Sequence, residues 1–190
     1  ANARPTIAIP PSATPIPITG TTADLFVMGN DAPPGDEGSL TYTWSQVFGP
    51  TPVTFSRNGT NGAKSTTVTF TQSGAWGFRV TVTDPGNLSV TADLTVVVPQ
   101  TPTQVLVTPA TATVNIGEDK QLGATVKDQF GTVIEGLSEA TWATSGCGTI
   151  SEFGKFSATT TGTCTITATL AGKMGTSTLT VQQSPVPRIV

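Results

Sequence analysis

The sequence contains no histidine and few charged residues. Lysine, arginine, aspartate and glutamate make up 11% of its 190 residues, against about 25% in an average soluble domain. The absence of histidine excludes a histidine general base, a Ser-His-Asp or Cys-His arrangement and a histidine-ligated metal. With a formal net charge of −3, the chain also lacks the basic surface that nucleic-acid binding requires, so no nucleic-acid partner is expected.

Long apolar runs are missing as well. No stretch approaches the roughly 18 consecutive apolar residues of a membrane-spanning helix, and the first residues form no charged-then-apolar leader. We therefore expect no membrane span, and a chain that either lost its leader or is a piece of a larger protein. Abundant threonine and scarce lysine suit a secreted or cell-surface location.

The abundant residues are those of short strands and turns. Threonine supplies 38 residues, glycine 20 and proline 15. Apolar and polar residues alternate with period two at 40–45, 76–83, 90–98 and 164–170, which is typical of half-buried strands, whereas no window has the period of a helix. The two Asn-Gly steps in 58–62 favour a hairpin turn. This pattern predicts an all-β fold of two consecutive antiparallel β-sandwich domains of the immunoglobulin type.

Proline placement predicts the domain boundaries. Five prolines within residues 1–18 indicate an extended lead-in or an edge strand, because proline cannot donate to a sheet ladder. An uncharged segment with two prolines, 99–104, favours a short, stiff linker. We predict a first domain over 1–99, a linker over 100–104, a second domain over 105–183 and a loosely held tail over 184–190.

Both halves resemble bacterial immunoglobulin-like modules. Leu40-Thr-Tyr-Thr-Trp44-Ser and the segment 74–84 resemble PKD-type repeats of bacterial extracellular proteins, although 45–50 departs from the commonest PKD pattern. The segments 126–131 and 162–168 resemble the group 2 bacterial immunoglobulin-like (Big) repeats. These resemblances imply tandem spacers, adhesion units or glycan-associated units of multimodular secreted or surface proteins, often beside glycoside hydrolases.

An acidic loop is a candidate calcium site, and calcium is the only cofactor that the sequence suggests. Asp31, Asp36 and Glu37 lie close together in sequence, and Asp84 or Asp24 could join them. Calcium prefers six to eight oxygen ligands, which carboxylates on loops at the end of a sandwich can supply. No Asp-x-Asp-x-Asp spacing is present, so an ordinary solvated loop is the alternative.

The remaining acids do not predict catalysis. Asp36-Glu37 and Glu118-Asp119 are adjacent in sequence, so a strand would point the two side chains of each pair in opposite directions. Glycoside hydrolysis needs two carboxyl groups about 5–10 Å apart in a cleft. We therefore predict that this region has no enzymatic activity.

The two cysteines, Cys147 and Cys164, are predicted to form a disulfide. Cys164 shares the inward parity of Ile166, and Cys147 lies in a Ser-Gly-Cys-Gly turn that can approach it. Two separate thiols are the alternative, and the absence of a Cys-x-x-Cys spacing argues against a redox-active pair.

Aromatic residues divide into predicted core and predicted surface positions. Strand parity and apolar neighbours place three tryptophans in the core: Trp44, Trp76 and Trp142. Four phenylalanines lie on the opposite parity or in turns, where they could stack on sugars: Phe26, Phe48, Phe130 and Phe153. Single exposed aromatics are common, however, and often have no function.

The leading hypothesis is a pair of non-catalytic spacer or presentation modules of a larger secreted or surface bacterial protein, such as a polysaccharide-degrading enzyme. Its partners would be the adjacent modules of the same polypeptide, and the chain is expected to be a monomer. The first alternative is a pair of carbohydrate-binding modules for plant-type polysaccharide. The second is a cell-surface adhesion module that binds a protein through an exposed sheet edge.

Overall fold

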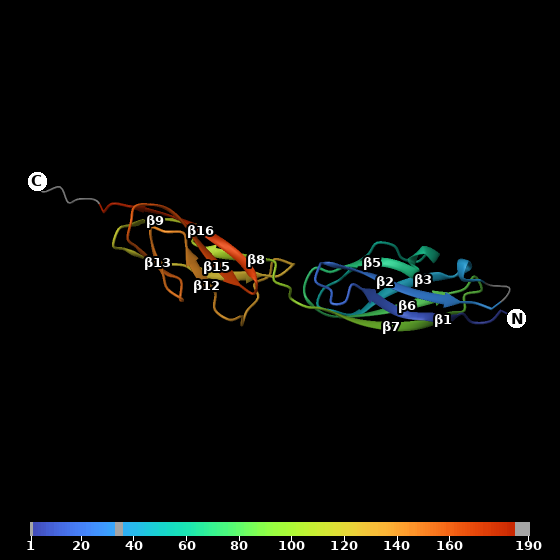
Figure 1. Cartoon of the computed structure of the whole chain (residues 1–190). Helices are drawn as coiled ribbons and strands as arrows, with labels where there is room; N and C mark the ends of the chain where they lie inside the picture. The colour runs from blue at the N-terminus through green and yellow to red at the C-terminus, as the bar shows by residue number, and fades with distance from the viewer. Residues whose placement is uncertain (1, 33–35, 185–190) are drawn as a thin grey trace, which may run out of the picture. The chain divides into compact units, whose positions relative to one another are not determined.

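The structure, a computed structural model, describes residues 2–32 and 36–184. The chain forms two compact units, Ala1–Thr101 and Pro102–Val190, both built of β-strands (Figure 1). The predicted all-β fold of antiparallel sandwiches is confirmed. The helices found in the described ranges are 3₁₀ turns of three and four residues, and neither is long enough to cross a membrane. Residues 185–190 of the predicted tail lie outside the described residues.

The first unit is a sandwich of two antiparallel sheets. One sheet has the strand order β1-β2-β5-β4 and the other β3-β6-β7. The elements are β1 (Thr6–Thr14), β2 (Thr22–Asn30), η1 (Glu37–Ser39), β3 (Thr41–Phe48), β4 (Thr54–Phe55), η2 (Asn61–Lys64), β5 (Ser65–Thr69), β6 (Gly74–Thr83) and β7 (Ser89–Val98).

The core of the first unit follows from the alternation along its strands. In β3, Tyr42 and Trp44 are buried while the threonine and serine that follow them face solvent. The buried ring of Trp76 packs against Phe70, with ring centroids 5.3 Å apart. The Trp44 indole N–H donates to the carbonyl of Ala63 at 2.9 Å, so this polar atom is satisfied inside the core.

β1 lies at an edge of its sheet, where it pairs with β2. Pro10 and Pro11 fall within this strand, and the register with β2 shifts between Ile7 and Ile9 and again between Ile9 and Ser12. An edge strand with irregular pairing tolerates both prolines, because a missing N–H costs little where no regular ladder requires it.

The segment 58–62 is not the tight hairpin turn that its Asn-Gly steps predict. β4 and β5 do pair antiparallel, but residues 56–64, including η2, connect them. The Asn58 side chain bonds the backbone N–H and carbonyl of Trp44 at 2.7 and 2.8 Å. The Asn61 amide donates to the carbonyls of Glu37 and Leu40. Both side chains therefore bind backbone groups of residues far away in the sequence. To reach them, the connection between β4 and β5 has to be longer than a two-residue turn.

The second unit consists of shorter strands in three sheets. Their orders are β12-β15-β16-β9, β10-β14-β13 and β11-β8. The strands are β8 (Gln104–Thr108), β9 (Thr111–Asn115), β10 (Asp119–Gln121), β11 (Gly123–Lys127), β12 (Thr141–Thr144), β13 (Gly148–Ile150), β14 (Lys155–Ala158), β15 (Gly162–Leu170) and β16 (Lys173–Gln182).

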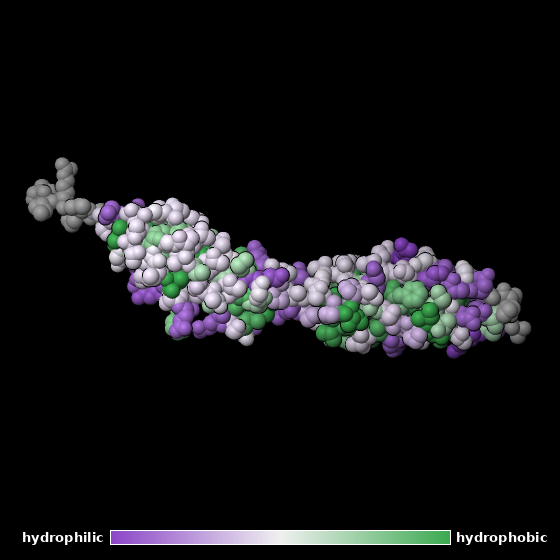
Figure 2. Space-filling view, viewed as in Figure 1, coloured by the Kyte–Doolittle hydropathy of each residue, from purple (hydrophilic) through white to green (hydrophobic). Residues whose placement is uncertain are grey.

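Alternating residues of β15 build the centre of this second core. Cys164 and Ile166 are buried and pack with Phe156 and Leu179. Cys147 and Cys164 form the predicted disulfide, with their Cα atoms 6.1 Å apart. The outward positions of β15 are threonines, and residues of near-neutral hydropathy cover most of the visible surface (Figure 2).

One pairing in the second unit departs from the antiparallel pattern. β16 and β9 are parallel over five residue pairs, from Thr178 opposite Thr111 to Gln182 opposite Asn115. Pro109 separates β8 from β9, and the two strands belong to different sheets. Since proline supplies no N–H and fixes its own φ, it interrupts one strand and allows the chain to cross to the other sheet.

Candidate functional site

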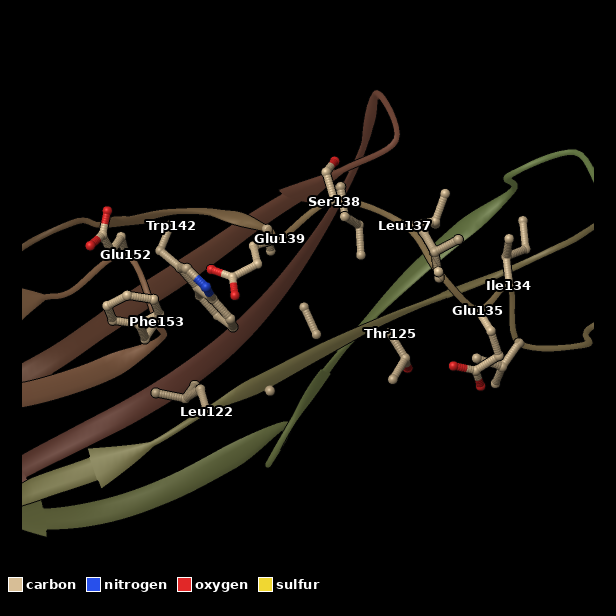
Figure 3. A pocket seen from close by; sticks show the side chains of 17 residues that line it. Leu122, Thr125, Ile134, Glu135, Leu137, Ser138, Glu139, Trp142, Glu152 and Phe153 are labelled. Atoms are coloured by element: carbon tan, nitrogen blue, oxygen red, sulfur yellow. The ribbon is translucent and has the colours of Figure 1, made fainter.

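The second unit carries an open groove of about 360 Å³. Its walls come from β11, the irregular segment 133–140, the beginning of β12 and the turn 151–154. In Figure 3, Trp142, Glu139 and Phe153 lie at one end of the groove, and Ile134, Glu135 and Leu137 lie toward the other. The groove therefore combines aromatic, aliphatic and acidic side chains.

Phe153 is presented by a turn that hydrogen bonds hold in place. The N–H of Gly154 donates to the carbonyl of Ser151 at 3.0 Å, and the N–H of Leu122 donates to the carbonyl of Gly154 at 2.9 Å. The Gln121 side-chain amide donates to the carbonyl of Phe153 at 2.7 Å. The backbone of the turn is thus fixed from two sides, while Phe153 itself remains 65% exposed.

Trp142 lies between the core and the groove. It is half-buried and packs against the core, but it also lines the groove, so the predicted core position describes only part of its environment. Gly154 has φ +77°, and a Cβ there would lie 2.8 Å from Cζ2 of Trp142 and 2.6 Å from the carbonyl oxygen of Leu122. Glycine is required at this position because the backbone is left-handed and the indole fills the space.

Three of the five glutamates in the chain line the groove: Glu135, Glu139 and Glu152. All three are exposed. The ion pairs found among the described residues lie elsewhere, at Lys64–Glu37, Arg79–Asp93 and Lys155–Asp119. Ionised carboxylates only accept hydrogen bonds, so the groove offers acceptors for hydroxyl or amine donors beside apolar ring faces. These residues were not among the predicted site residues, although three glutamates between 135 and 152 are a signal in the sequence.

The structure does not bring the four predicted surface phenylalanines together. In the first unit, Phe26 is half-buried on β2, and Phe48 is 49% exposed on β3 of the opposite sheet. In the second unit, Phe130 is half-buried in a turn where the Asp128 carboxylate accepts the N–H of Phe130 at 2.9 Å. Of the four, Phe153 lines the groove.

The four acids predicted as a calcium site separate into two kinds. The Asp36 carboxylate caps η1, and Glu37 forms an ion pair with Lys64 at 2.8 Å. Asp31 and Asp84 are instead buried, with exposed fractions of 6% and 4%. Within the described ranges, no three His, Cys, Asp or Glu side chains are grouped in a way that could hold a metal ion.

Glu37 is the centre of a polar network in the first unit. Its carboxylate accepts hydrogen bonds from Lys64 at 2.8 Å and from the Tyr42 hydroxyl at 3.0 Å, and that hydroxyl accepts the N–H of Gly29 at 2.9 Å. The hydrogen bond from Lys64 lowers the pKa of Glu37, and burial raises the pKa of Tyr42 to about 12. Neither group has a pKa suited to proton transfer near pH 7, so the network stabilises the fold and does not serve acid–base chemistry.

Comparison with known proteins identifies relatives of the first unit and of the fold. Residues 16–98 match the family model described as K319L-like, PKD domain. No curated protein sequence matches the chain. A fragment of Drosophila N-cadherin, EC1-4, is similar in structure with a TM-score of 0.61 and 14% identity, covering 97% of this chain and 50% of that one. Mouse cadherin-23 EC22-24 is similar with a TM-score of 0.52 and 12% identity, covering 98% and 68%.

These comparisons support the fold and the type of the first unit. At such low identity the cadherin structures show a shared immunoglobulin-like architecture alone. The chain spans half the length of the N-cadherin fragment that it matches. The resemblance of the second half to Big repeats stays a prediction.

Proposed function

We propose that the chain is a non-catalytic pair of immunoglobulin-like modules in a larger secreted or surface bacterial protein, where it spaces or presents neighbouring modules. The observation that carries this proposal is the pairing of an early strand of the second unit with its last described strand. β9 lies near the beginning of the unit and β16 is its last described strand, and the two are parallel neighbours over five residue pairs.

The parallel pair β9–β16 resists tension along the chain. Once β8 has detached from β11, a force reaches β9 through its first residue and β16 through its last residue, and it pulls the two strands in opposite directions along their length. All hydrogen bonds between them are then loaded together, whereas the bonds of a hairpin pulled open from its ends break one after another. Among the described residues of the first unit, β1 and β7 belong to different sheets, so no such ladder joins its first and last strands.

Pulling the chain by its two ends in single-molecule force spectroscopy tests this proposal. We expect two unfolding events, with the second unit breaking at the higher force. Ala112→Pro places a residue without an N–H at the second position of β9, so it should lower that force while the event of the first unit serves as the internal control. Equal forces for both units, or no effect of Ala112→Pro, would contradict the proposal.

The groove of the second unit supports a second candidate function, binding of a polysaccharide. Trp142 and the exposed Phe153 offer ring faces to the C–H faces of a sugar, and the three groove glutamates offer acceptors to its hydroxyl groups. This arrangement is confined to one unit, so it supports a single binding module rather than a pair.

Affinity electrophoresis of the chain in gels containing cellulose derivatives, xylan, β-glucan or mannan tests the second function. Binding predicts retardation in at least one gel and its loss in Phe153→Ala, which removes an exposed ring without opening the core. Phe48→Ala is the matched control, because Phe48 is an exposed ring of the first unit. Equal mobility of all three proteins in every gel would contradict polysaccharide binding and leave the spacer function as the remaining proposal.

A further inference from the structure

Asp31 is a buried carboxylate that has no hydrogen-bond partner among the residues that the structure describes. Its exposed fraction is 6%, and both carboxylate oxygens are shielded from solvent and accept no hydrogen bond from residues 2–32 or 36–184. Burial of an ionised carboxylate is strongly unfavourable unless donors or a cation compensate for its lost hydration. A position that keeps both oxygens unsatisfied is therefore suited to a bound cation.

Asp84 brings a second buried carboxylate to the same end of the first unit. Gly29 of β2 and Val82 of β6 meet between the two sheets, since a Cβ on Gly29 would lie 2.9 Å from Cγ1 of Val82. Asp31 and Asp84 each follow one member of this contact by two positions. Because side chains alternate along extended chain, and because both aspartates are buried, the two carboxylates point into the same end of the sandwich.

The surroundings of Asp84 supply further polar atoms, and no cationic side chain of the described residues forms an ion pair with it. Its carboxylate accepts the N–H of Leu88 at 2.9 Å and the side-chain amide of Asn2 at 2.9 Å. The oxygen of that same amide is an acceptor of the kind that calcium binds. No lysine or arginine of the described residues forms an ion pair with either aspartate.

We propose that Asp31 and Asp84 bind one calcium ion at this end of the first unit, with the side-chain oxygen of Asn2, backbone carbonyls and water completing its shell. Calcium accepts six to eight oxygens in irregular geometry, whereas magnesium demands a near-ideal octahedron and retains its water. Asp36 and Glu37 are not ligands, because the cap of η1 and the ion pair with Lys64 occupy them. With two carboxylates, the Kd should lie at about 10⁻⁴–10⁻³ M, as in extracellular modules.

Calorimetry of the full chain, depleted of metal and then titrated to 10 mM calcium chloride, tests the site. The unfolding transition of the first unit should rise by about 4 °C or more once calcium exceeds its Kd several-fold. The transition of the second unit, recognised by its response to reductant, should not move. Magnesium chloride at the same concentration should produce a smaller shift. Terbium luminescence, excited through the aromatic residues of the first unit, should report one bound ion per chain that calcium displaces.

Two isosteric variants separate the proposed ligands from the neighbouring acids. Asp31→Asn should lose the response to calcium and should be the more stable protein in calcium-free buffer, because it removes an uncompensated charge. Asp36→Asn is the matched control and should respond to calcium like the natural chain. Asp84→Asn, as a second ligand variant, should also lose the response.

The proposal is overturned by either of two results. The first is a natural chain whose transition is unmoved by 10 mM calcium and which gives no saturable terbium signal. The second is an Asp31→Asn variant that responds to calcium as strongly as the natural chain. Terbium binding by the natural chain decides the matter even if the variants fail to fold.

Discussion

Reduction of the Cys147–Cys164 disulfide should destabilise the second unit and leave the first unchanged. The bond joins residues 17 positions apart. On the loop-entropy model, a crosslink over a loop of this size stabilises the folded state by about 3 kcal/mol at 25 °C. For a domain of 60–100 residues, each kcal/mol shifts Tm by about 4–8 °C. The expected loss is therefore about 12–24 °C in the Tm of the second unit.

Differential scanning calorimetry with and without reductant measures this shift directly. The first unit contains no cysteine, so its transition is an internal control in the same scan. Reduction of the natural chain is a cleaner perturbation than Cys164→Ala, because Cys164 is 2% exposed and its replacement also removes core packing. Cys147→Ser, at a half-buried position, provides a second route to the open form.

Two outcomes would refute this reasoning. If both transitions fall together on reduction, the units do not unfold independently and the separate cores do not act as separate cooperative units. If the transition of the second unit moves by less than about 4 °C, the crosslink does not act through the entropy of the unfolded chain.

The first unit offers three further predictions. The first unit should become less stable to urea as the pH rises from 10 to 12, because burial raises the pKa of Tyr42 from 10.0 to about 12. The stabilisation from the neutral hydroxyl is complete below the pKa of the unfolded chain and is lost as the pH rises through the pKa of the folded chain. An equally steep loss of stability in Tyr42→Phe would show that another group causes it. Lys64 lowers the pKa of Glu37 from 4.5, so the stability that this ion pair contributes is lost as the pH falls through the pKa of Glu37 in the folded chain. In Lys64→Met, stability to urea should therefore depend less on pH in the acidic range. Gly29→Ala should lower the free energy of unfolding by about 1–3 kcal/mol through overpacking, since its Cβ would meet core side chains at 2.8 and 2.9 Å. Gly20→Ala is the control, because a Cβ at that position has nothing within 4 Å. Equal Tm values for the two variants would contradict the predicted clash.

The fold class was predictable because the signal for a half-buried strand is local. In β3, the alternation of Tyr42 and Trp44 with small polar residues fixes both the strand and the face that is buried. The pairing of β9 with β16 was not predictable in this way. It joins residues more than 60 positions apart, and a sequence pattern of period two specifies which face is buried but not which strand lies alongside.

The candidate sites illustrate the same limit. Phe153 could be named as a surface aromatic because it lies in a turn, but its neighbours in the groove come from the irregular segment 133–140, which has no period to interpret. Asp31 and Asp36 look alike in sequence, and the structure separates them: the Asp36 carboxylate caps η1, whereas the Asp31 carboxylate is buried and has no partner in the described part of the chain. That distinction depends on the facing sheet, so the local sequence does not carry it.

Both outer strands of the sheet β1-β2-β5-β4 are poor templates for another chain. β1 contains two adjacent prolines and slips in register, and β4 is two residues long. A strand of another molecule could not pair stably with β1, which offers no regular row of donors, or with β4, which is too short. Molecules crowded at high local concentration are thereby protected at these edges against strand exchange and fibre growth.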